Sequence, residues 1–114
     1  MPDRVIVFAS DLLDRSRIDA ALGTDHNVEF ERDPAGVSPG GTIRSVVVDL
    51  AKFAECLTSL REALGPAVRI VAYGPHVDDA LLHGATSAGA TEVFPRSRFF
   101  RDVRNVALGQ PTDR

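Results

Sequence analysis

Apolar residues gather in five short segments, separated by stretches with helical spacing or by glycine and proline. The segments predicted as strands are residues 5–9, 27–31, 43–50, 68–73 and 91–94. The continuous apolar runs at 5–9 and 46–48 are typical of central strands in a parallel sheet, buried on both faces. In the second segment, Val28 and Phe30 alternate with polar residues, which indicates an edge strand with one solvent-facing side.

Helical periodicity fills most of the intervals between these segments. Ser10 or Asp11 is placed to cap a first helix that ends at Gly23. Its apolar stripe is imperfect, because the adjacent Leu12 and Leu13 cannot both face the core. The clearest stripe has i, i+4, i+7 and i+11 spacing and consists of Phe53, Leu57, Leu60 and Leu64.

Two further helices and one loop complete the prediction. A helix of small residues is expected from Asp78 or Asp79 to Gly89, and a single last helix carries Phe99 inward and runs to about Leu108. Residues 32–42 are rich in glycine and proline and are predicted to be a loop.

This alternation of strands and helices predicts one α/β domain over residues 1–110, followed by a polar tail at 111–114. Short connections imply a parallel sheet covered on both faces by right-handed crossovers. In such sheets, functional residues lie at the carboxyl ends of the strands. The residues at these ends are 9–11, 49, 73–76 and 94–97.

Two of these strand ends resemble segments of the receiver domains of bacterial response regulators. Residues 46–50 read VVVDL and resemble the third receiver strand, whose aspartate accepts a phosphoryl group, so Asp49 is the phospho-acceptor candidate. Residues 89–97 read GATEVFPRS and resemble the fifth-strand segment, with Arg96 and Ser97 in place of lysine and proline. The resemblance implies a flavodoxin-like (CheY-like) fold, with a five-stranded parallel sheet of order 2-1-3-4-5 and helices on both faces. The second helix is expected to be short or missing, because residues 32–42 take its place.

The acidic residues that bind Mg²⁺ in receivers are largely missing here. The adjacent acidic pair after the first strand aligns with Ala9 and Ser10, and Asp11 comes a residue or two late. The serine or threonine that ends the fourth strand in receivers is replaced by Ala72 or Tyr73. Mg²⁺ requires oxygen ligands in near-octahedral geometry. We therefore expect no Mg²⁺ and no other cofactor, and we interpret the chain as a degenerate, or pseudo-, receiver.

Each residue at the strand ends has a structural and a functional interpretation. We expect Asp49 to pair with Arg96 or to cap the following helix, the alternative being phosphorylation. Ser97 is expected to cap the last helix, and Arg96 alternatively binds a small anionic ligand or nucleotide. His76 follows Gly-Pro and is expected to be a solvated loop residue, the alternative being pH sensing or ligand contact. The pocket candidates are Ser10, Asp11, His76, Arg96 and Ser97.

A second candidate region is the arginine-rich end of the chain. Phe99 and Phe100 are adjacent and cannot both face inward, so Phe100 is expected to be partly exposed beside arginines, a combination typical of interfaces. In receivers this face is the usual output and dimer surface. The interaction candidates are Arg98, Phe100, Arg101 and Arg104, the alternative being a solvated helix face.

Composition excludes several classes of function. The net charge of −3 argues against binding to nucleic acid or to an anionic membrane. A single cysteine, Cys56, excludes an intrachain disulfide, and no apolar stretch reaches the ~20 residues that span a bilayer. Lys52 is the only lysine, which is typical of a GC-rich, here bacterial, genome.

No catalytic motif was found, and we therefore expect no enzyme activity. The leading hypothesis is a cytoplasmic signalling module that binds a protein partner or a second copy of itself. The alternatives are a working phospho-receiver that uses Asp49, and a sensor of small anions at the strand ends.

Overall fold

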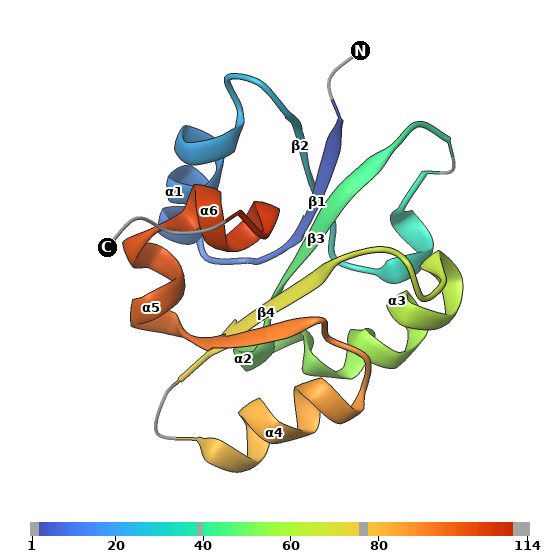
Figure 1. Cartoon of the computed structure of the whole chain (residues 1–114), viewed down its shortest axis with the longest axis vertical. Helices are drawn as coiled ribbons and strands as arrows, with labels where there is room; N and C mark the ends of the chain where they lie inside the picture. Colours follow the sequence, from blue (N-terminus) through green and yellow to red (C-terminus); the bar gives the residue numbers. More distant parts are fainter. Residues whose placement is uncertain (1–2, 39, 76–77, 111–114) are drawn as a thin grey trace.

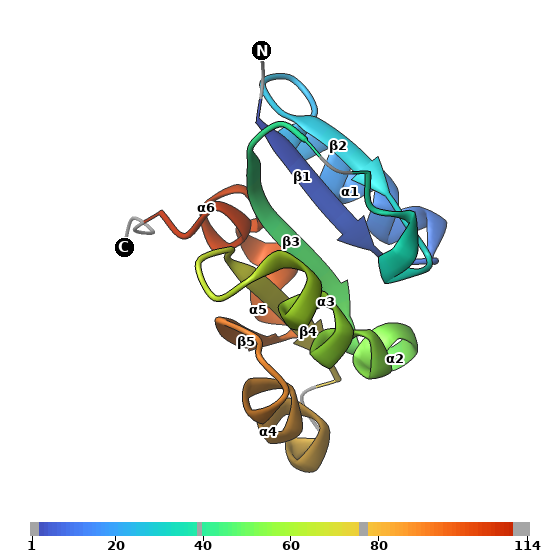
Figure 2. The ribbon, with the colours of Figure 1, turned by 90° about the vertical axis from the view of Figure 1, so that its right-hand side faces the viewer.

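The structure, a computed structural model, describes residues 3–38, 40–75 and 78–110 as a parallel sheet between two layers of helices (Figures 1 and 2). The five strands have the order β2-β1-β3-β4-β5, as predicted. Their bounds are Arg4–Phe8 for β1, Asn27–Phe30 for β2, Ile43–Asp49 for β3, Ile70–Gly74 for β4 and Glu92–Pro95 for β5. All paired strands are parallel. The predicted fold is therefore confirmed.

Two apolar cores lie on opposite faces of the sheet. The first core combines Val5 and Val7 of β1 with side chains of the helices α1 (Leu12–Leu22), α5 (Arg96–Arg101) and α6 (Val103–Leu108). The second combines Ile6 and Phe8 with α2 (Leu50–Phe53), α3 (Leu57–Leu64) and α4 (Asp79–Ser87). Successive residues of a strand point to opposite faces. A strand between two cores must therefore be apolar throughout, as the run at 5–9 is.

One predicted loop and two predicted helices differ in detail from the observed structure. Within the predicted loop 32–42, Pro34–Gly36 forms a short 3₁₀ helix, η1, so the second helix is reduced to one turn. The stripe that begins at Phe53 is interrupted by a second 3₁₀ turn, η2 (Ala54–Cys56). The prediction of a single last helix was wrong, because Asp102, with φ −152° and ψ 63°, divides this segment into α5 and α6.

The start of α1 also differs from a simple amphipathic helix. Leu12 and Leu13 are 78% and 60% exposed, so neither faces the core. The helix instead buries Asp14, Ile18 and Leu22, which are spaced four residues apart and therefore lie on one face. A carboxylate thus occupies the first position of the buried stripe.

Among the residues that the structure describes, no helix combines the length and the apolar character needed to cross a bilayer.

Stability should depend on the second core and not on the exposed leucines. Leu60 is fully buried on α3, so Leu60→Ala should lower the free energy of unfolding by about 2–5 kcal/mol through lost burial and a residual cavity. The matched control is Leu12→Ala, which removes the same atoms from a largely exposed site and should change stability little. Urea denaturation measures both variants, and equal losses would contradict the packing described.

Candidate functional site

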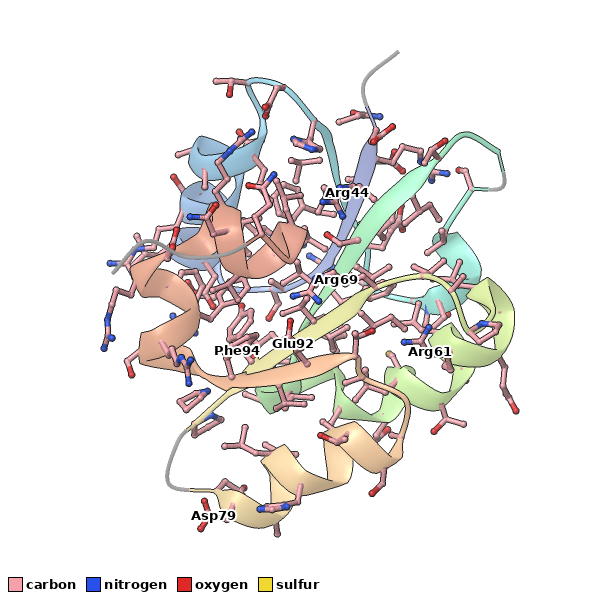
Figure 3. All side chains as sticks on the ribbon, in the orientation of Figure 1. Arg44, Arg61, Arg69, Asp79, Glu92 and Phe94 are labelled. Carbon is pink, nitrogen blue, oxygen red and sulfur yellow. The ribbon has the colours of Figure 1, made fainter. Side chains whose placement is uncertain are left out.

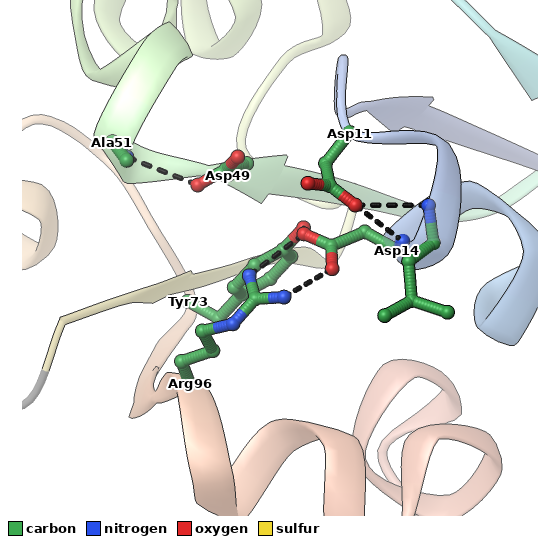
Figure 4. Close-up of polar contacts among 7 residues, drawn as sticks. Asp11, Asp14, Asp49, Ala51, Tyr73 and Arg96 are labelled. Carbon is green, nitrogen blue, oxygen red and sulfur yellow. Dashed lines mark hydrogen bonds and ion pairs between the residues drawn. The ribbon is translucent and has the colours of Figure 1, made fainter.

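The carboxyl ends of the strands bring a group of charged side chains together (Figure 4). Asp11 follows β1, Asp49 ends β3, Tyr73 lies near the end of β4 and Arg96 follows β5. Asp14, on the first turn of α1, lies among them and was not predicted as a site residue. The predicted strand-end residues therefore lie close together, but the centre of this cluster is a different aspartate.

The Asp14 carboxylate accepts more side-chain hydrogen bonds than any other group of this cluster. Its side chain has no exposed surface, although the Arg96 side chain that pairs with it is 44% exposed. Arg96 binds both carboxylate oxygens, with Nη1 2.7 Å from Oδ2 and Nη2 bonded to Oδ1. The Tyr73 hydroxyl also donates to Oδ2, at 2.9 Å. Asp14 thus accepts three hydrogen bonds, two of them from a cation.

Burial and these hydrogen bonds have opposite effects on the pKa of Asp14. Burial acts to raise its pKa, but the hydrogen bonds from Arg96 and Tyr73 outweigh burial and hold the pKa below its ordinary value. The pKa of Arg96 is raised, chiefly by the same bond to Asp14. Burial and the neighbouring carboxylates raise the pKa of Tyr73. At neutral pH the pocket therefore contains an ionised aspartate–arginine pair and a neutral tyrosine.

Asp49 is arranged differently from Asp14. Its Oδ1 accepts the Ala51 N–H at 3.0 Å and caps α2, so the predicted capping role is confirmed. The predicted pair with Arg96 is wrong, because Arg96 binds Asp14. Asp49 is 6% exposed, and burial, together with repulsion from Asp14 and Asp11, raises its pKa despite the Ala51 bond and the more distant Arg96. Asp49 is a buried acid without an ion-pair partner among the described residues.

The residues present do not fit the Mg²⁺ site of receivers. Oδ1 of Asp11 accepts the N–H groups of Leu13 and Asp14, at 2.9 and 3.0 Å, and caps α1 as expected. Both oxygens of Asp14 are taken by Arg96 and Tyr73. Across the described parts of the chain, no group of three or more histidine, cysteine, aspartate or glutamate side chains is placed to hold a metal ion. Figure 4 shows the Arg96 guanidinium bound to the Asp14 carboxylate, so the charge of Asp14 is already neutralised by a cation.

The other pocket candidates take no part in this network. Ser10 is exposed beside Asp11. Ser97 is the second residue of α5 and is exposed, and no side chain caps that helix, so the prediction that Ser97 caps it was wrong. The helix instead begins directly after Pro95. His76 lies outside the described residues.

The interaction candidates lie on two sides of the C-terminal helices. Phe100 is partly buried against Tyr73 and Phe99, and Arg96 and Arg17 lie over its ring at 4.8 and 5.4 Å. The prediction that Phe100 is the partly exposed phenylalanine, beside arginines, is confirmed, and Phe99 is fully buried.

Arg104 also lies on the α1 side of these helices. It binds both carboxylate oxygens of Asp25, at 2.9 and 2.5 Å, in the turn that follows α1. Arg98 and Arg101 lie on the other side, near β5. Arg101 and Arg104 belong to different helices, α5 and α6, because the predicted single last helix is divided at Asp102.

The signal for Asp14 was present in the sequence. Asp14, Ile18 and Leu22 are spaced four residues apart, so an aspartate stands at the first position of an apolar stripe. A buried charge requires a partner of opposite sign. Arg96, at another strand end, is one residue that such a search would have considered.

No protein-family model and no curated protein matches the sequence. Solved structures of receiver domains do resemble the chain. The phosphorylated cyanobacterial phytochrome response regulator RcpA has a TM-score of 0.74 and 14% identity over 93% of this chain and 91% of that one. A response regulator from Thermotoga maritima has a TM-score of 0.68 and 18% identity, covering 96% and 100% of the two chains.

Full-length FixJ from B. japonicum has a TM-score of 0.64 and 18% identity over 91% of this chain, which spans only 59% of FixJ. These likenesses show the fold: the chain has the CheY-like fold of response-regulator receiver domains.

The two buried aspartates should respond in opposite ways to loss of charge. Asp14→Asn removes the anion that neutralises Arg96 and should destabilise the protein by about 1.5–3 kcal/mol at neutral pH. Asp49→Asn keeps an oxygen that can cap α2 and removes a charge that burial disfavours, so it should be neutral or stabilising. Urea denaturation at pH 7 compares them, and destabilisation by Asp49→Asn as large as by Asp14→Asn would contradict the assignment.

The pH dependence of stability should separate the same two groups. Because the pKa of Asp14 is lowered on folding, its contribution is complete above its ordinary pKa of about 4 and is lost as the pH falls through the folded value. The effect of Asp49 on stability has the opposite sign. Its buried charge destabilises the protein at neutral pH, and this destabilisation diminishes as the pH falls through its raised pKa. As the pH is lowered, the free energy of unfolding should therefore decrease less steeply in Asp14→Asn than in the wild type. In Asp49→Asn it should decrease more steeply. Parallel curves for all three proteins would refute this.

Proposed function

We propose that this chain is a non-enzymatic signalling module of the receiver fold, whose strand-end pocket is held permanently in one state by an internal ion pair. The observation that carries the proposal is the Arg96–Asp14 pair, in which a fully buried carboxylate is bound by both arms of a guanidinium. The likeness to response-regulator receivers supports a role in signal transduction. A bacterial cytoplasmic setting is part of this proposal.

The pocket charges argue against phosphoryl transfer onto Asp49. Transfer to a carboxylate needs cations that stabilise the charge developing on the phosphoryl oxygens. Here the nearby guanidinium is bound to Asp14, so Asp14 has no free oxygen for Mg²⁺, and Asp11 and Asp49 each use one oxygen to cap a helix. We therefore propose that the module requires no metal and no phosphorylation.

Sensing of a small anion at Arg96 is the less favoured alternative. An anion would have to displace Asp14 and leave that buried carboxylate without its cation, which costs several kcal/mol. Because Arg96 is engaged by Asp14 in this way, we favour contact with a protein partner or a second copy as the means of signalling.

Magnesium and beryllofluoride, a phosphoryl mimic, test the proposal directly. In amide NMR spectra of the whole chain, neither reagent should shift the signals of residues 9–11 and 49–51 specifically. The matched control is Asp49→Asn, which should give the same response as wild type. Shifts in the wild type that centre on Asp49, spread to α5 and vanish in Asp49→Asn would establish a working phospho-receiver instead.

A further inference from the structure

A groove runs between the last strand and the two C-terminal helices. Its volume is about 700 Å³. Arg69, Glu92 and Phe94 lie together on the sheet side, as Figure 3 shows, and Arg98 and Arg101 line the helix side. The groove lies beside β5, which is the last strand of the sheet and pairs with β4 alone. It is separate from the strand-end pocket, whose aspartates do not line it.

The groove is lined by residues at the break in the last predicted helix. At Asp102 the chain leaves the helical conformation, and α6 continues in a different direction from α5 (Figure 1). Arg101, Asp102 and Asn105, on either side of the break, all line the groove. The interruption thus places polar side chains along the sheet margin, while Phe99 and Val103 remain in the core.

Three of the charged side chains in the groove make contacts within the protein, and Arg69 and Glu92 neutralise one another. Nη2 of Arg69 lies 2.5 Å from Oε1 of Glu92, and Arg69 also donates to the Val106 and Ala107 carbonyls at the end of α6. Asp102 accepts a hydrogen bond from the Asn105 side chain at 3.1 Å. Both acidic residues of the groove are therefore engaged in local contacts.

Arg98 and Arg101 are the exception. Both side chains are exposed, and neither makes a hydrogen bond or ion pair with any other residue that the structure describes. The guanidinium of Arg98 lies over the Phe94 ring, 5.5 Å from its centre. Residues three apart on a helix lie on one face. The groove thus presents two unneutralised guanidinium groups from one helix face beside an aromatic ring.

We propose that this groove binds an acidic segment of a partner protein, whose carboxylates pair with Arg98 and Arg101 while an apolar side chain packs on Phe94. Guanidinium groups bind carboxylates through paired hydrogen bonds, and arginine and aromatic side chains are enriched at the centres of protein interfaces. A peptide is favoured over nucleic acid because the whole chain carries a net charge of −3, which repels a polyphosphate backbone. The inference rests on the proposed partner-binding function and specifies the chemistry of the partner.

The test uses the full chain and a short fluorescent peptide of glutamate with one central phenylalanine. Amide NMR should show shifts confined to residues lining the groove, and fluorescence anisotropy should show that Arg101→Glu weakens binding by about tenfold or more, the loss expected for one charge-assisted contact. Arg98→Gln should weaken it less, because it removes one charge without adding repulsion. Arg101 is exposed and makes no hydrogen bond or ion pair with the described residues, so its variant should keep the wild-type circular dichroism spectrum.

The matched control is Arg32→Glu, which makes the same charge change at an exposed arginine outside the groove. It should leave the affinity within about twofold of wild type. The same peptide with glutamine in place of glutamate should not bind. An equal loss in Arg32→Glu, shifts outside the groove, or tighter binding of a thymidine oligonucleotide would overturn the inference.

These outcomes are independent of the metal and beryllofluoride titration. If the groove binds no peptide and the signals near Asp49 do not respond to magnesium or beryllofluoride, only this inference is contradicted. If the signals near Asp49 do respond, the proposed function is contradicted, whatever the groove binds.

Discussion

The burial of one carboxylate constrains the rest of this molecule. An aspartate with no exposed surface is tolerated only when a cation and hydrogen-bond donors surround it, because an unpaired charge in the interior costs several kcal/mol. For Asp14 these partners come from two other elements, with Tyr73 on β4 and Arg96 at the start of α5. The need to neutralise one charge therefore joins α1, the sheet and the C-terminal helices. Arg96 is thereby bound to Asp14, and Asp49 has no ion-pair partner among the described residues.

Much of the fold was predictable because its signals are local. The apolar runs at 5–9 and 46–48, the caps at Asp11 and Asp49 and the resemblance of residues 46–50 and 89–97 to receiver segments led to the observed strand order. Which aspartate forms the ion pair with Arg96 was not predictable in the same way. Arg96 had two buried aspartates within reach, and its choice of Asp14 depends on how α1 is oriented over the sheet, which no local spacing records.

The C-terminal arginines illustrate the same limit. The spacing of Phe99, Val103 and Val106 fits one continuous helix, and the sequence around Asp102 contains no glycine or proline that would predict a break there. Once the chain bends there, Arg104 meets Asp25 while Arg98 and Arg101 face the margin of the sheet. Three arginines that were predicted to belong to one interaction surface are thus divided between an internal contact and a groove. A list of exposed charges from sequence alone overestimates how many are available to a partner.

The distance along the chain between Asp14 and Arg96 has a consequence for how the protein reaches its native state. The two residues are 82 positions apart, and Tyr73 is 59 positions from Asp14. During synthesis from the N-terminus, the first helix emerges long before the residues that neutralise its buried charge. Docking of that helix onto the nascent sheet is disfavoured until the fifth strand has been added, because Asp14 keeps its hydration until then. The ion pair therefore makes closure of the first core a late event that requires nearly the whole chain, and it links the two ends of the domain into one cooperative folding unit.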